Sequence, residues 1–181
     1  MSTTQIALLA LCALLLFWGV GAYNRLVALR NAIARAIAPL ESQIRQRHDL
    51  LLRWCDGLAP VLEPSTQWSD AVRAACAQLQ GAGDALLAQP ASAPLASSVR
   101  LAESVLTSAR QRLLAALPAG HERLSGLETE FLVEQLTAAD NTLAFARDQF
   151  NVATDHYNRA VRQFPTWVIA HLFGFRVAGT L

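Results

Sequence analysis

The stretch that decides the fold is YNRLVALRNAIARAIAPLESQIRQRHDLLLRWCDGL, residues 23–58. Alternating steps of three and four residues through it select almost only apolar side chains. Such a sustained period indicates one long helix with a single apolar seam, as in coiled coils. The predicted seam comprises Tyr23, Leu26, Arg30, Ile33, Ile37, Leu40, Ile44, Arg47, Leu51, Trp54 and Leu58.

Arg47, His48 and Asp49 stand side by side in this stretch and resemble a catalytic or metal-binding cluster. Consecutive residues on a helix point in different directions, so we interpret them as ordinary helix. Asp49 belongs instead to a stripe of alternating charge at spacing four, which is typical of a solvent-exposed helix face. The stripe is Glu41, Arg45, Asp49 and Arg53.

Three further helices are predicted over residues 66–88, 95–117 and 122–164, because apolar residues recur there at helical spacing. Loops containing Pro or Gly separate the helices, at residues 57–65, 89–94 and 118–121. Four helices with short turns predict antiparallel neighbours. The expected fold is all-α, with an amino-terminal transmembrane helix followed by an antiparallel up-and-down four-helix bundle (residues 24–165) whose first and fourth helices are long.

Residues 1–23 are expected to form a transmembrane anchor. Residues 6–22 are apolar throughout, and a bilayer core needs about 20 residues of helix. A cleaved signal peptide is the first alternative, supported by the small residues 20–22 but lacking a positive amino-terminal region. A lipoprotein signal is the second, although Leu11 before Cys12 is larger than such a signal requires. A retained single-pass helix fits best.

The charges that flank this anchor predict its orientation. Arg25, Arg30 and Arg35 follow it, and no acidic residue occurs before Glu41. Positively charged flanks stay in the cytoplasm, so the amino terminus is expected outside and the bundle inside. The apolar tail, residues 166–181, is too short for a confident span. It either lies on the membrane surface or straps across the bundle, and a fourth helix that returns to the membrane favours the surface.

Arg47 is an exception within the apolar seam and suggests a specific contact. If the first and fourth helices run antiparallel, Arg47 lies level with Asp140. We predict that an Arg47–Asp140 contact fixes the register of the two helices. The alternative is that the Arg47 stem extends along the surface and its guanidinium reaches water.

Asn151 and Asn158 are unusual residues for the middle of a helix. They form hydrogen bonds between helices, or together with Tyr157 they line a ligand groove. Patterns of known chemistry are missing: the four His have no metal-binding spacing, the three Cys form no pair motif, and no phosphate-binding loop occurs. We therefore expect no enzyme activity, metal or cofactor, and the net charge of +1 argues against nucleic acid as a partner.

Three blocks of the sequence resemble the LemA family of bacterial membrane-anchored helical proteins. They are YNRLVALRNAI (23–33), IRQRHDLL (44–51), and DNTLAFARDQFNVATDHYNRAVRQFP (140–165), which leads into IAHLFGF (169–175). The family-block residues singled out are Tyr23, Asn24, His48, Asp49 and Arg147. The chain departs from the family at residues 51–54, where Ile-Pro-Asn-Leu is usual, and at Asp140, where Glu is usual.

The resemblance implies an anchored bundle on the cytoplasmic side of the bacterial inner membrane, with no catalytic site. It also implies a partner in membrane quality control, such as a membrane zinc metalloprotease. Beyond the bilayer, the expected function is therefore binding of a protein partner or self-association into a homo-oligomer. The alternative is a bundle that binds a small ligand or lipid at the membrane surface.

Overall fold

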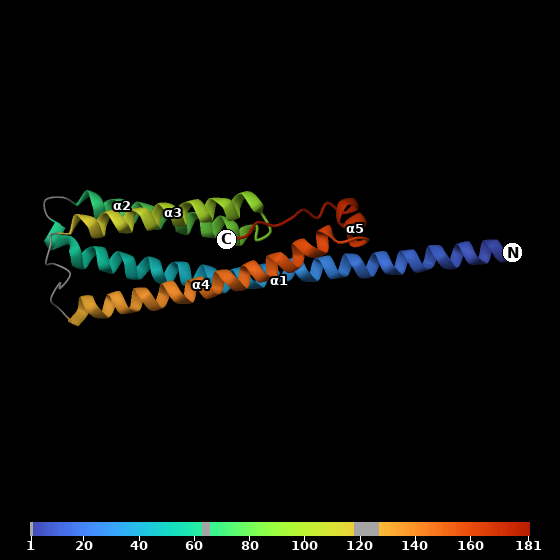
Figure 1. Ribbon diagram of the computed structural model, residues 1–181, viewed down its shortest axis with the longest axis horizontal. Helices are drawn as coiled ribbons and strands as arrows, with labels where there is room; N and C mark the ends of the chain where they lie inside the picture. Colours follow the sequence, from blue (N-terminus) through green and yellow to red (C-terminus); the bar gives the residue numbers. More distant parts are fainter. Residues whose placement is uncertain (1, 63–65, 118–126) are drawn as a thin grey trace.

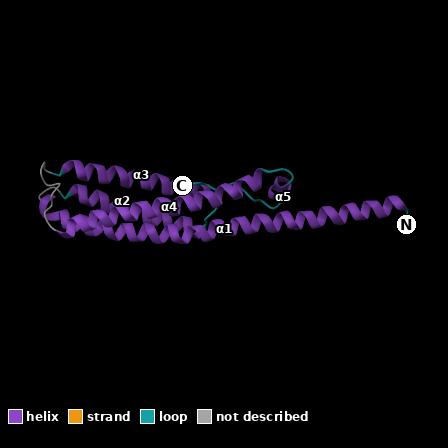
Figure 2. Ribbon diagram, turned by 60° about the horizontal axis from the view of Figure 1, so that its bottom comes forward, coloured by secondary structure: helices purple, strands orange, loops and turns teal. Residues whose placement is uncertain are grey.

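The computed structural model describes residues 2–62, 66–117 and 127–181. Every regular element in these ranges is a helix, as Figure 2 shows. The helices are α1 (Thr3–Leu62), α2 (Gln67–Ala88), α3 (Ala93–Ala116), α4 (Leu127–Arg162) and α5 (Thr166–Leu172). The prediction of an all-α chain is confirmed, while the predicted turn at 118–121 lies outside the described residues.

Helix α1 is longer than the sequence predicted. It contains 60 residues without a break and spans about 90 Å at 1.5 Å per residue. The predicted interruption from residue 57 is wrong, because α1 passes through Gly57 and Pro60 and ends at Leu62. A proline interrupts the hydrogen bonds of the turn that precedes it. Pro60 lies two residues from the end, where little of the helix remains to be disturbed.

The bundle helices α1 to α4 pack against one another as three neighbouring pairs in the described residues. Helix α1 lies along both α4 and α2, and α2 lies along α3. In Figure 1, α4 runs alongside α1 in the opposite direction. A closed four-helix arrangement would also bring α3 against α4. Among the described residues, however, no Cα atoms of α3 and α4 lie within 8 Å of each other. One side of the bundle is therefore open.

The buried residues follow the seams expected from the sequence. On α1 the seam is buried from Leu26 to Leu58, apart from the exposed Arg30. On α4 large and small side chains alternate, which lets the two helices approach closely. The buried apolar residues of α4 are Leu136, Ala139, Leu143, Ala146, Phe150, Tyr157 and Ala160.

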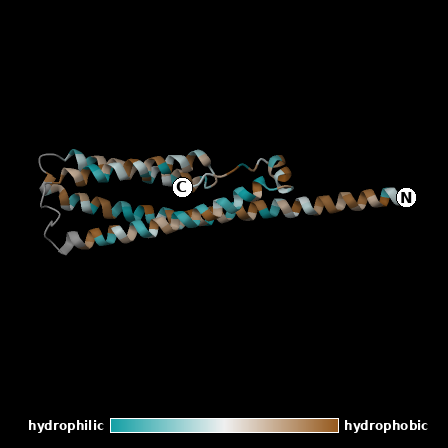
Figure 3. Ribbon diagram, in the orientation of Figure 1, coloured by the Kyte–Doolittle hydropathy of each residue, from teal (hydrophilic) through white to brown (hydrophobic). Residues whose placement is uncertain are grey.

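The first part of α1 projects beyond the bundle and is apolar, as Figures 1 and 3 show. Its most apolar 18-residue window has a mean hydropathy of 2.3, and only 6% of that window is buried. A long, exposed apolar helix of this kind is compatible with a membrane anchor. It continues into the bundle part of α1 without a break at residues 23–24.

Helix α5 packs against α1 where the projecting part begins. Ile169 and Ala170 form a small buried cluster with Ala22 and Leu26. The ring of Tyr23 lies 4.9 Å from that of Phe173, measured between centroids. After α5 the chain turns back along the bundle, and residues 175–181 contain no helix or strand.

Candidate functional site

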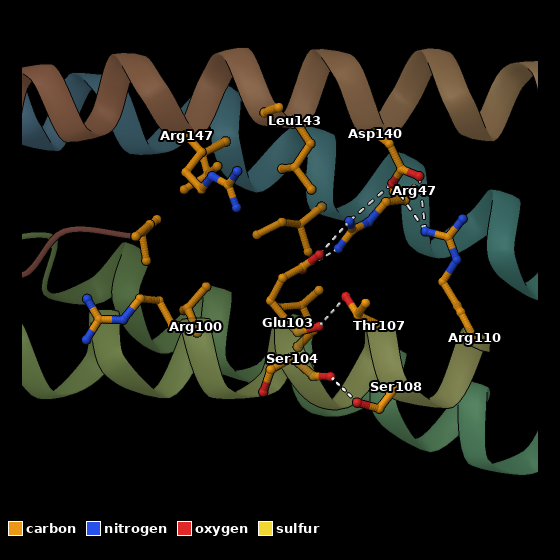
Figure 4. A pocket seen from close by; sticks show the side chains of 16 residues that line it. Arg47, Arg100, Glu103, Ser104, Thr107, Ser108, Arg110, Asp140, Leu143 and Arg147 are labelled. Atoms are coloured by element: carbon orange, nitrogen blue, oxygen red, sulfur yellow. Dashed lines mark hydrogen bonds and ion pairs between the residues drawn. The ribbon is translucent and has the colours of Figure 1, made fainter. Parts of the chain in front are cut away.

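The open side of the bundle contains a groove of about 720 Å³, which we call the α3–α4 groove. Helices α1, α3 and α4 supply most of its walls, and Figure 4 shows Arg147, Leu143 and Glu103 pointing into the space between them. The lining residues are Leu40, Ile44, Arg47, Leu79, Val99, Arg100, Glu103, Ser104, Thr107, Ser108, Arg110, Asp140, Leu143, Ala144, Arg147 and Leu181.

Ion pairs at the floor of the groove connect three helices (Figure 4). Arg47 of α1 donates to both carboxylate oxygens of Glu103 on α3, over 2.8 Å from Nη1 and 2.5 Å from Nη2. The same Nη1 donates to Oδ1 of Asp140 on α4 over 3.2 Å. Arg110 of α3 donates to Oδ2 of Asp140 over 3.0 Å. Two guanidinium groups and two carboxylates thus link α1, α3 and α4, although no Cα atoms of α3 and α4 lie within 8 Å of each other among the described residues.

Arg47 is the most buried member of this ion-pair cluster, with 5% of its side chain exposed. Burial alone would lower the pKa of its guanidinium, but the hydrogen bonds and charges of Glu103 and Asp140 outweigh that effect and raise the pKa. Arg47 therefore stays charged inside the bundle. A buried charge depends on its partners, so the cluster disfavours shifted helix registers.

The structure brings Arg47 and Asp140 together, and the Arg47 guanidinium does not reach water along its stem. The sequence did not point to Glu103, although this residue makes the shorter contacts with Arg47. The only hint of Glu103 in the sequence is its position directly after Ala102, one of the buried apolar residues that recur at helical spacing along α3.

The structure places the chain's own tail on Asn151, Tyr157 and Asn158, where the sequence left open a ligand groove. The Asn151 amide donates to the carbonyl of Leu181 and accepts from its N–H, both over 2.7 Å. Asn158 makes the same pair of bonds to Ala178, over 2.9 and 2.7 Å. The Tyr157 hydroxyl donates to a backbone carbonyl of the tail, 2.9 Å away. These polar groups are therefore engaged within the chain.

The tail is held in an extended conformation between α4 and α3. Asn151 and Asn158 are two helical turns apart, about 10.5 Å along α4. Ala178 and Leu181 must match that distance with three residues, which requires an almost fully extended chain. On the other side, a Cβ atom on Gly179 would lie 2.7 Å from the Ala96 Cβ, so only glycine fits there.

Two further arginines flank the groove where the tail ends (Figure 4). Arg100 of α3 donates to the carbonyl of Thr180 over 2.7 Å and to the hydroxyl of Ser97 over 2.9 Å. Arg147 of α4 is exposed and points into the groove. Neither guanidinium has a carboxylate within 4 Å in the described part of the chain.

The other residues singled out from the sequence form no catalytic arrangement in the described ranges. Tyr23 packs on Phe173, while Asn24 and Asp49 are exposed. The Nδ1 atom of His48 is buried and has no hydrogen-bond partner among the described residues. No group of three or more His, Cys, Asp or Glu side chains suited to a metal ion occurs in that part of the chain.

Two of the three cysteines are buried in the core, where their thiols are poorly reactive. Cys55 and Cys76 are free thiols within the main apolar cluster. Burial raises the pKa of each thiol to about 11, so few thiolates form at neutral pH. They are unsuited to act as nucleophiles.

Comparison with known proteins identifies the family of this chain. The model of the LemA family matches residues 36–180, which is most of the chain and contains the sequence blocks from Ile44 onward. The block at 23–33 precedes the matched range. No curated protein matches the chain. The chain belongs to the LemA family.

Proposed function

We propose that the protein is a membrane-anchored, non-enzymatic interaction module whose α3–α4 groove docks a segment of a partner protein. The observation that carries this proposal is the groove between α3 and α4, whose Cα atoms stay more than 8 Å apart in the described residues while α1 packs on α4 and α2, and α2 packs on α3. Amphipathic helices bury their apolar faces against other elements. A groove that has ion pairs at its floor and is lined by both apolar and charged residues is suited to binding a partner.

The proposal places α1 across the bacterial inner membrane and α5 on the membrane surface. Helix α5 contacts α1 at the foot of the apolar projection, where a Cβ atom on Gly19 would lie 3.5 Å from Ile169. Its outward side chains are large and apolar, which suits the interfacial zone of a bilayer. The exposed apolar residues of α5 and of the positions beside its ends are Phe164, Trp167, Val168, Leu172 and Phe173.

The positive flank of α1 supports an orientation with the bundle in the cytoplasm. Protease added to intact spheroplasts checks this orientation, because a cytoplasmic bundle is protected until the membrane is lysed. Digestion in intact spheroplasts would place the bundle outside. The docking proposal holds in either orientation, although the available partners differ.

A lipid- or small-ligand-binding role at Asn151, Tyr157 and Asn158 is the weaker candidate. The side-chain amides and the hydroxyl that would contact a ligand are hydrogen-bonded to the tail. A ligand would first have to displace residues 176–181.

The test is purification of the tagged full-length protein from gently solubilised native membranes, with a variant that fills the groove. Ala144→Trp places a bulky side chain on the groove wall. Ala138→Trp adds the same bulk to an exposed position of α4 outside the groove. We expect one stoichiometric partner with the unaltered protein and with Ala138→Trp, but not with Ala144→Trp. A partner retained equally by both variants would contradict docking in the groove.

A further inference from the structure

The chain's own tail shows what kind of ligand the space between α3 and α4 accepts. Asn151 and Asn158 recognise the backbone N–H and C=O of Leu181 and Ala178, and these contacts do not depend on side-chain identity. An extended peptide is therefore already bound along one part of this side of the bundle. The α3–α4 groove continues the same path beyond Leu181, which forms one end of it.

The length of the open part can be expressed in residues of an extended peptide. From Asn151, level with Leu181, to Asp140 at the far end, α4 rises about 16.5 Å. An extended chain covers this distance with about five residues. Arg147 lies about 6 Å from Asn151 along α4, toward Asp140. Arg147 is therefore level with the second residue of such a peptide.

The charges of the groove favour an acidic ligand. Among the lining side chains, four are arginines, namely Arg47, Arg100, Arg110 and Arg147, and two are acids, Glu103 and Asp140. Both acids are engaged by Arg47 and Arg110 at the floor. Positive charge remains at Arg100 and Arg147, on opposite walls, and planar guanidinium groups bind carboxylates in bidentate geometry.

The deeper lining is apolar and complements this charge. Leu40, Ile44 and Leu143 face the groove from α1 and α4, and Val99 faces it from α3. Successive side chains of an extended peptide point to opposite sides. A segment that alternates apolar and acidic residues would bury its apolar side chains on these residues and present its carboxylates to Arg147.

We propose that the open part of the α3–α4 groove binds an extended partner segment of about five residues with alternating apolar and acidic side chains, and that Arg147 binds its carboxylates while the charge of Arg100 on the opposite wall adds to the attraction. The proposal rests on the docking function above and names the chemistry of its partner. A membrane surface is the less suitable anionic ligand. The tail and α5 lie between the groove and the apolar projection of α1 (Figure 1).

The test measures binding of two fluorescein-labelled hexapeptides to the full-length protein in detergent micelles by fluorescence anisotropy. One peptide alternates Val and Asp, and the other alternates Val and Lys. We expect the acidic peptide to bind, with an affinity that falls as salt rises, and the basic peptide not to bind. Arg147→Glu should weaken acidic-peptide binding at least about tenfold, as loss of a charge-assisted contact predicts.

The matched control is Arg112→Glu, which makes the same charge change at an exposed α3 position outside the groove lining. It should leave the affinity within about twofold. Equal effects of Arg147→Glu and Arg112→Glu, equal binding of both peptides, or no binding of the acidic peptide up to about 1 mM would overturn the proposal. A native partner that is lost with Ala144→Trp but whose docked segment is basic or neutral would overturn this inference alone, and the docking function would stand.

Discussion

At the scale of single residues, Arg47 organises the inside of the molecule. It is a charged side chain at an apolar-seam position, and it contacts acids on both α3 and α4. Buried ion pairs contribute little net stability because desolvation opposes attraction, but removing one partner leaves a buried charge unpaired. The register of α1, α3 and α4 therefore depends on this residue more than on any one apolar contact.

Arg47→Met tests the ion-pair cluster. Methionine keeps the apolar stem but leaves Glu103 beside an apolar wall, so we expect a loss of about 2 kcal/mol in the free energy of unfolding, reduced by the partial exposure of Glu103. The double variant Arg47→Met/Glu103→Gln should recover part of that loss. Chemical denaturation measures both. Arg53→Met, at an exposed α1 position, should change stability by less than about 0.5 kcal/mol.

The sequence could reveal Arg47 and Asp140 but not their full surroundings. Arg47 breaks an apolar repeat, and the antiparallel register then points to Asp140. Glu103 breaks no repeat, because it stands beside the α3 stripe in a helix rich in Ser and Arg. Its contact with Arg47 depends on how α3 is placed across the bundle, which local patterns do not specify.

At the scale of elements, the tail is the least predictable part of the fold. Its apolar composition allowed a membrane-surface segment or a strap. The structure contains α5 beside α1 and then an extended strap over α4. The two asparagines of α4 are unusual residues for a helix interior. Their partners are backbone groups of the tail, which carry no sequence signature.

Gly179→Ala tests the docking of the tail. The added Cβ atom would lie 2.7 Å from the Ala96 Cβ and 2.8 Å from the Ala93 Cα, so the tail must shift. We expect a loss of about 1–3 kcal/mol in stability, typical of overpacking, and faster hydrogen exchange at the amides of Ala178 and Leu181.

Gly81→Ala serves as the matched control, because nothing lies within 4 Å of its added Cβ atom in the interior of α2. It should stabilise the protein by up to about 1 kcal/mol through higher helix propensity. Unchanged exchange at Ala178 and Leu181 in Gly179→Ala would show that the tail is not held where the structure has it.

Apolar periodicity predicts the helix boundaries well where it is strong. Single Gly and Pro residues predict them poorly. Helices α2 and α3 lie within two residues of their predicted starts. Gly57 and Pro60 predict an end of the first helix from residue 57, yet α1 continues to Leu62. Packing of Trp54 and Leu58 in the core outweighs the low helix propensity of their neighbours.

At the scale of the whole molecule, the open side between α3 and α4 was not predictable from sequence. The apolar residues of α3 and α4 recur with the same period as those of fully packed helices. This period therefore does not indicate which pair of helices stays apart. Between these two helices lie the tail at one end and the Arg47 ion pairs further along. The apolar projection of α1 was predictable, because composition alone distinguishes it from the rest of the chain.

Photocrosslinking in living cells tests whether the protein contacts its partner in the α3–α4 groove. A benzophenone amino acid would replace Ala144 inside the groove or, as the matched control, the exposed Ala138 on the same helix. We predict one discrete protein adduct from position 144 and none from position 138. Adducts of equal yield from both positions, or an adduct from position 138 alone, would contradict docking of the partner in the α3–α4 groove.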